Sequence, residues 1–315
     1  MIMPEVKKLL NELRQHKATL KIVVLAGFFW ALAQVWQQLL IKDLGDSLQK
    51  GNHSKIVQIA VSIMILYIVI GISRYFHLYL MNLTGERVVQ GLRQKLQTKL
   101  MCLNLNFHNN YVSGSGGLIS RVLNDISIIQ NGLRMFADFF REPLIFFGLF
   151  SYLLWVDWKL TLSIFIILPF ILLFLKQISR TIKTYSIKTQ EDLEKITSTI
   201  KESLDGVRII QSFNLEKEMQ TRFEKEGEEF LFSRKKVHQR VELSGPVTEF
   251  IAASLIVSIA VYMSYEISAQ RATIGDFMSY LASLIQLSSP IKKLQESYVR
   301  IQETTVAAKR VFALL

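Results

Sequence analysis

Six apolar runs that contain no Asp, Glu, Lys or Arg alternate with polar segments along this chain. The first run has 20 residues and the second has 18, and about 20 apolar residues in a helix cross the ~30 Å hydrocarbon core of a bilayer. The other four have 14 to 16 residues, a length that alone also suits a buried helix. Their repetition in one chain predicts membrane-spanning helices. The runs are Ile22–Ile41, Ile56–Ser73, Pro143–Val156, Leu160–Leu175, Phe250–Tyr265 and Phe277–Ile291.

Two long polar segments, 85–106 and 180–236, are predicted to continue the membrane helices beyond the bilayer. Neither contains proline, and the second has apolar residues at helical spacing from Ile196 to Val207. Structureless segments of this length are uncommon. We therefore expect an all-α membrane protein of six long helices with cytoplasmic extensions. Their expected ranges are about 20–43, 56–106, 128–156, 159–205, 218–267 and 275–305.

The distribution of positive charge predicts the orientation. Half of the 315 residues are hydrophobic, and the formal net charge is +11. With the N-terminus inside, the inner segments 1–21, 81–134 and 176–240 carry 25 Lys and Arg, and the outer segments carry 5. Lys and Arg accumulate on the cytoplasmic side of membrane proteins. Both termini are therefore expected in the cytoplasm.

Several kinds of site are not expected in this chain. Cys102 is the only cysteine, and the five histidines are scattered without metal-ligand spacing. No G-x-x-x-x-G-K-[ST] phosphate-binding motif occurs, so the chain is expected to bind no cofactor and to hydrolyse nothing by itself. The basic run 233–240 lies just inside an apolar run, where it is better interpreted as a membrane anchor than as a nucleic-acid site.

A polar, glycine-bearing stretch interrupts the apolar pattern. The segment Phe107–Ile126 reads FHNNYVSGSGGLISRVLNDI. It resembles the first intracellular loop of the ATP-binding-cassette (ABC) exporters, with the pattern F-x-x-x-x-x-G followed by G-x-L-x-S-R-x-x-x-D. In that family the loop forms a coupling helix, here at about 111–126, that docks on a nucleotide-binding domain. The alternative from composition alone is a flexible Ser/Gly linker.

A second segment resembles the other intracellular loop of the same family. Residues Leu204–Glu216 read LDGVRIIQSFNLE and fit the pattern G-x-x-x-[IV]-x-x-[FY]-x-x-E. The alternative is a simple helix break at Gly206. The resemblance implies a coupling helix at about 205–216 that reaches the nucleotide-binding domain of the opposite protomer. The coupling residues that the two loops imply are Gly114, Gly117, Leu118, Ser120, Arg121, Asp125, Gly206, Phe213 and Glu216.

Further similarities follow in the family's order along almost the whole chain. They are 158–162, 275–277, Pro290 and 307–312. The resemblance implies a type IV exporter (ABC type 1) transmembrane domain that works as a homodimer, with helices four and five packed on the other protomer. It also implies a nucleotide-binding domain, expected after residue 315, that binds ATP and Mg. The location implied is the bacterial inner membrane.

The closest resemblance is to the MsbA-type lipid A flippases, through residues 40–44, 141–150 and 289–294. In that family basic residues on helices two, three and six hold the two phosphates of the lipid. Arg141 and Lys292 fall at matching positions. Ile70 stands where the family has its helix-two arginine, and Arg74 lies one turn further on, on the same helix face.

The expected partners are an amphipathic lipid substrate, membrane lipid, a second copy and an ABC nucleotide-binding domain. Acyl chains need an apolar lining, for which the candidates are Phe28, Phe29, Leu32 and Phe146. Three functions stay open: a lipid A or lipopolysaccharide flippase half, a peptide or multidrug exporter domain, and a membrane scaffold or receptor that meets no ATPase. The two loops argue against the third.

Overall fold

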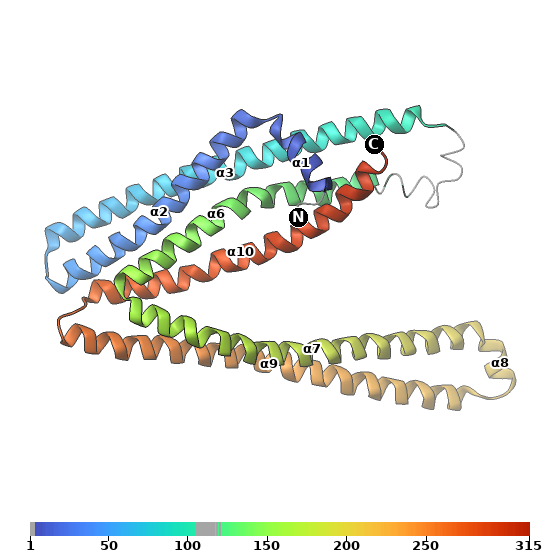
Figure 1. The fold of residues 1–315 in the computed structure, drawn as a ribbon. Helices are drawn as coiled ribbons and strands as arrows, with labels where there is room; N and C mark the ends of the chain where they lie inside the picture. Colours follow the sequence, from blue (N-terminus) through green and yellow to red (C-terminus); the bar gives the residue numbers. More distant parts are fainter. Residues whose placement is uncertain (1–3, 105–116, 118, 120) are drawn as a thin grey trace. The chain divides into compact units, whose positions relative to one another are not determined.

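The computed structural model describes residues 4–104, 117, 119 and 121–315, which form helices joined by short turns and include no strand (Figure 1). Six of the helices have 31 to 53 residues. In chain order the elements are α1 (Pro4–Arg14), α2 (Lys17–Gln49), α3 (His53–Cys102), the π-helical turn η1 (Arg121–Asp125), α6 (Ile126–Val156), α7 (Trp158–Asp205), α8 (Val207–Ser212), α9 (Glu216–Ser268) and α10 (Ile274–Phe312).

Four of the described helical segments are long and apolar enough to cross a membrane. They are α2, α3, the segment Leu123–Val156 and α9, and the start of α7 adds a shorter apolar segment, Trp158–Ile171. The sixth long helix, α10, has polar side chains such as Ser279, Ser283 and Gln286 among its apolar ones. That all six long helices span the membrane therefore remains a prediction for α7 and α10.

Local sequence signals fix several helix ends. The Asn52 side chain accepts a hydrogen bond from the Lys55 amide (3.2 Å) at the start of α3, as expected of an N-cap. Thr273 and Asp276 form a reciprocal capping box at the start of α10. Only Asp157 separates α6 from α7. Gly51, between α2 and α3, has a φ of 63°, which a glycine adopts at no steric cost.

The chain divides into two compact units. The first contains residues 1–158 and 265–315, and here α2, α3, α6 and α10 pack side by side (Figure 1). Its core includes Leu92, Leu133 and Ala308, each almost fully buried. A Cβ atom at Gly132 would lie 1.7 Å from Thr304 Oγ1, so only glycine permits this close approach of α6 and α10.

The second unit, residues 159–264, is a hairpin of α7 and α9 with α8 at the turn (Figure 1). Polar side chains join the two long helices. Ser233 Oγ donates a 2.7 Å hydrogen bond to Asp192 Oδ2, and both residues are buried. Thr199 Oγ1 donates a 2.7 Å bond to Glu226 Oε2. Buried polar groups need such partners, so these bonds fix how the polar parts of the two helices pair.

Candidate functional site

Trp30 is the centre of a cluster of charged residues inside the first unit. Its side chain is buried, with 5% of its surface exposed. Three cations from three other helices approach its ring. The distances to the ring centroid are 3.7 Å from the Arg141 guanidinium, 5.7 Å from Lys293 Nζ and 5.8 Å from the Arg74 guanidinium. Each lies within the ~6 Å range of a cation–π interaction, and tryptophan is the strongest partner for it.

Two carboxylates of α6 balance these cations. Arg141 Nη2 lies 2.8 Å from Asp138 Oδ1 and also forms a short ion pair with Glu142 Oε1. Lys293 Nζ lies 3.2 Å from the same Glu142 oxygen. Arg141 and Glu142 are 3% and 1% exposed. Charges so deeply buried persist only when they are paired, so α6 and α10 are joined here by electrostatic contacts.

The cluster retains unused hydrogen-bond donors. In the described part of the chain, Arg141 Nε, Arg141 Nη1 and Trp30 Nε1 are buried and have no hydrogen-bond partner. Guanidinium N–H groups are donors only, and leaving them unpaired in a buried place is unfavourable. An acceptor group brought to this cluster would satisfy them. A phosphate suits a guanidinium especially well, because it can accept two parallel hydrogen bonds.

His77 supports Trp30 from α3. Its ring packs edge-on against the indole, with centroids 5.8 Å apart. His77 Nδ1 lies 2.9 Å from the Val23 carbonyl oxygen, so Nδ1 carries the proton and donates. Nε2 then faces Asp138 Oδ1 at 3.9 Å. A Cβ at Gly27 would lie 2.9 Å from His77 Nδ1, and the missing side chain thus lets α2 and α3 approach.

The structure brings together some of the predicted phosphate-binding residues. Arg74 and Arg141 meet at Trp30, as described above. The lysine of α10 at this cluster is Lys293, and the neighbouring Lys292 is exposed. The sequence argument missed Asp138, Glu142 and Lys293 as members. Asp138 could have been found from its i, i+3 spacing to Arg141, which places both residues on one helix face.

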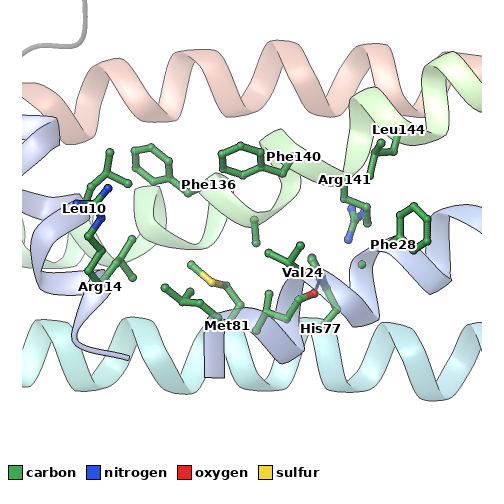
Figure 2. Close-up of a pocket in the computed structure, with 15 residues that line it drawn as sticks. Leu10, Arg14, Val24, Phe28, His77, Met81, Phe136, Phe140, Arg141 and Leu144 are labelled. Carbon is green, nitrogen blue, oxygen red and sulfur yellow. Dashed lines mark hydrogen bonds between the residues drawn. The ribbon is translucent and has the colours of Figure 1, made fainter. Parts of the chain in front are cut away.

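An elongated apolar cavity of about 260 Å³ lies beside this cluster, between α1, α2, α3 and α6 (Figure 2). Of the four predicted lining residues, Phe28 contributes to its wall. Phe29 and Leu32 are about half exposed, at 55% and 49%. Phe146 is half-buried and stacks on Phe150, with ring centroids 6.1 Å apart.

Most of the first predicted coupling loop lies outside the described residues. Gly114, Leu118 and Ser120 are among the residues outside them. Gly117 is helical and half-buried. Arg121 Nη1 donates a 3.1 Å hydrogen bond to the Arg310 carbonyl oxygen. Asp125 is buried and lies 3.5 Å from Arg310 Nη1. The end of this loop is therefore tied to the last turns of α10.

The second predicted coupling segment forms the turn of the α7–α9 hairpin. Gly206 immediately precedes α8, and Glu216 begins α9. No residue of α8 is buried. Ile209 is 63% exposed and Phe213 is 72% exposed. Exposed apolar side chains gathered at the tip of a hairpin are typical of a protein-binding surface.

Comparison with known proteins identifies sequence relatives. Residues 20–291 match the family model of the ABC transporter transmembrane region. A protein of Syntrophus aciditrophicus named ATP-dependent lipid A-core flippase is 25% identical over 311 residues, which are 98% of this chain and 51% of that protein. A protein of the same name from Desulfotalea psychrophila is 27% identical over 98% of this chain and 54% of its own length.

A third flippase of this name, from Alcanivorax borkumensis, is 25% identical over 100% of this chain and 54% of its own length. The chain thus spans about half the length of the curated relatives it matches.

Proposed function

This chain belongs to the family of ABC transporter transmembrane regions, and on that premise we propose that it is the membrane-spanning half of an ATP-driven lipid exporter. Its substrate is a lipid A or lipopolysaccharide-type amphiphile, which it moves from the inner to the outer leaflet by alternating access. The relatives' shared name, ATP-dependent lipid A-core flippase, supports this choice of substrate.

The observation that carries the proposal is the meeting of three cations at Trp30. Arg74, Arg141 and Lys293 stand against two carboxylates, Asp138 and Glu142. The surplus of one positive charge and the unpaired N–H groups of Arg141 favour an anionic ligand rich in acceptors. Charged groups within membrane segments are costly and generally mark a substrate pathway. A lipid phosphate meets all of these requirements.

The complete transporter requires partners that the proposal names. A nucleotide-binding domain supplies ATP and Mg, and it docks on the loop 111–126 and on the exposed side chains around α8. A second copy completes a homodimer, in which helices four and five cross to the other protomer. The excess of Lys and Arg in the predicted inner segments supports cytoplasmic termini. The bacterial flippases that the chain resembles support a location in the bacterial inner membrane.

Lipid binding by single variants tests this function. Native mass spectrometry would measure the dissociation constant of a hexa-acylated, bisphosphorylated glucosamine lipid. We expect Arg74→Gln and Lys293→Gln each to weaken binding about tenfold or more, because a hydrogen bond to a charged group contributes about 1.5–3 kcal/mol. The variant Lys292→Gln, measured in the same way, shows which of the two neighbouring lysines binds the lipid. Lys50→Gln, which changes an exposed lysine after α2, is the control.

Equal affinities of all four variants and the parent chain would contradict a phosphate site at Trp30. We would then propose a peptide or multidrug exporter instead, and one observation supports this alternative. Phe28, Phe140 and Phe147 present exposed aromatic rings on α2 and α6. Loss of drug or peptide binding on replacing these rings with alanine, with lipid binding unchanged by the cation variants, would establish the alternative.

A further inference from the structure

The cavity beside the charged cluster is elongated and apolar, and a phosphate group of the proposed substrate would not fill it. Figure 2 shows it as an elongated space with Leu10 and Arg14 at one end and Phe28 and Leu144 at the other. Most of its wall consists of apolar side chains, including Leu13, Leu20, Met81 and Phe136, and His77 and Arg141 also line it. Polar ligands would lose their hydrogen bonds in such a space.

The volume of the cavity suits part of one hydrocarbon chain. An apolar cavity of ~150 Å³ holds one benzene molecule and stays dry when empty. In the same proportion, the 260 Å³ found here holds about ten carbons. A peptide segment of this volume would bring several backbone N–H and C=O groups into a wall whose polar side chains are limited to Arg14, His77 and Arg141. An acyl chain has no such groups.

The end of the cavity at Arg14 is basic. Arg14 ends α1 and is exposed, and Lys17 and Lys21 follow within the first two turns of α2, also exposed. None of the three forms an ion pair in the residues that the structure describes. Basic residues where a membrane helix begins attract the anionic headgroups of the inner leaflet.

The side of the cavity is open as well. Val24 and Phe140 both line it and are 60% and 65% exposed. A chain can therefore enter sideways from the bilayer while its headgroup stays at the surface. Burial of apolar side chains that are now exposed stabilises such a complex by the hydrophobic effect.

We propose that this cavity binds one acyl chain of an anionic glycerophospholipid, whose phosphate meets Arg14 beside Lys17 and Lys21. The bound lipid is a resident of the membrane domain and is distinct from the exported amphiphile at Trp30. It fills the space under α1 and so joins α1 to α2 and α6. Arg141 of the Trp30 cluster also lines the cavity, near the end opposite Arg14 (Figure 2). The phosphate contact proposed at Arg14 uses none of the cluster's cations, so the Arg14→Gln variant tests this proposal separately from the proposed substrate site.

The test compares lipid retention by the full chain in native mass spectra. The probes are phosphatidylglycerol, phosphatidylethanolamine and a bisphosphorylated glucosamine lipid, each added at defined concentration. We expect one phosphatidylglycerol per chain, bound about fivefold more tightly than phosphatidylethanolamine, which is the effect of about one basic residue near an anionic lipid. Arg14→Gln should reduce this preference to near equality.

A second variant fills the cavity instead of changing its charge. Val24→Phe adds volume inside the wall and should abolish the tightly bound lipid. Val61→Phe, at an exposed position of α3 outside the cavity wall, is its matched control and should retain it. Circular dichroism of all variants checks that the helices are intact, and the same spectra report the oligomeric state.

Three results would overturn the proposal. One is unchanged phosphatidylglycerol binding in both Arg14→Gln and Val24→Phe. Another is one-for-one displacement of phosphatidylglycerol by the glucosamine lipid with the same sensitivity to both variants, which would make the cavity part of the export site. The third is loss of dimer in Val24→Phe with lipid retention unchanged, which would make the cavity mouth a contact between copies.

Discussion

Arg141 is held in place by residues that lie on its own helix and on α10. Glu142 accepts a hydrogen bond from its guanidinium, Asp138 forms an ion pair with it, and Lys293 shares the Glu142 oxygen. A buried charge that loses its partner is far more costly than a buried pair replaced as a whole. The stability of this cluster therefore depends on which of its members are removed together.

The first prediction concerns the ion pair of Arg141 and Asp138. Arg141→Ala alone leaves the carboxylate of Asp138 buried without its cation, and we expect a loss of about 3–5 kcal/mol in the free energy of unfolding. The double variant Arg141→Ala/Asp138→Ala should lose less than the single one, because no charge is stranded. Thermal unfolding in a mild detergent measures both. A double variant as unstable as the sum of its single variants would contradict the coupling.

The second prediction concerns Gly132, where α6 meets α10. Gly132→Ala places a methyl group 1.7 Å from Thr304 Oγ1, so the helices must separate, at a cost of about 1–3 kcal/mol. Gly71→Ala is the matched control, since nothing lies within 4 Å of its added Cβ. That variant should be neutral or more stable by up to about 1 kcal/mol. Equal melting temperatures of the two variants would refute the close contact.

The sequence contains enough to find Arg74 and Arg141 but not the lysine that meets them. Lys292 and Lys293 are adjacent and identical in chemistry, and on a helix they point about 100° apart. Only the rotation of α10 against α6 decides which one faces Glu142, and that rotation is set by contacts such as Gly132 with Thr304. Such tertiary contacts are not visible in a single sequence.

At the scale of elements, apolar runs and breaks predict where helices lie, and packing decides how far they extend. The range expected for the last helix ends at about 305, and α10 continues to Phe312. Ala307, Ala308 and Val311 are buried in the core of the first unit, so these last turns are stabilised by contacts with other helices. The break at Gly206 separates α7 from α8, where the pattern L-D-G already indicates it.

The third prediction concerns the hairpin of α7 and α9. A hydrogen bond from Ser233, helped by Lys195, holds the pKa of Asp192 below its ordinary value. A lowered folded-state pKa stabilises the hairpin above the unfolded-state pKa, and this stability is lost as the pH falls through the folded-state pKa. Ser233→Ala should cost about 1.5–3 kcal/mol at neutral pH and less in acid.

Thermal unfolding of the parent chain and Ser233→Ala between neutral and acidic pH measures this effect. Ser258→Ala is the control, because the Ser258 hydroxyl donates a hydrogen bond within its own helix, to the Ser254 carbonyl oxygen. A constant difference between parent and Ser233→Ala across the whole pH range would show that Asp192 is not the titrating partner.

At the scale of the whole molecule, the proposed function requires that the membrane domain respond to a nucleotide-binding domain. The chain spans about half the length of its relatives, and the exposed apolar tip around α8 is the surface proposed to receive that domain. Ile209 and Phe213 are largely exposed there, which is unfavourable in water unless a partner covers them. Their substitution should therefore affect coupling and leave the lipid site intact.

The fourth prediction follows. In a transporter reconstituted with its nucleotide-binding domain, Phe213→Asp should reduce lipid-stimulated ATP hydrolysis about tenfold or more, because a charge replaces an aromatic anchor of the kind that dominates interface energies. Affinity for the bisphosphorylated lipid should stay unchanged. Leu193→Asp, at an exposed position of α7 outside the tip, should leave both properties intact. Normal ATP hydrolysis in Phe213→Asp would remove α8 from the docking surface. If charge reversal in residues 114–125 also left ATP hydrolysis normal, the result would favour a membrane scaffold or receptor that acts without an ATPase.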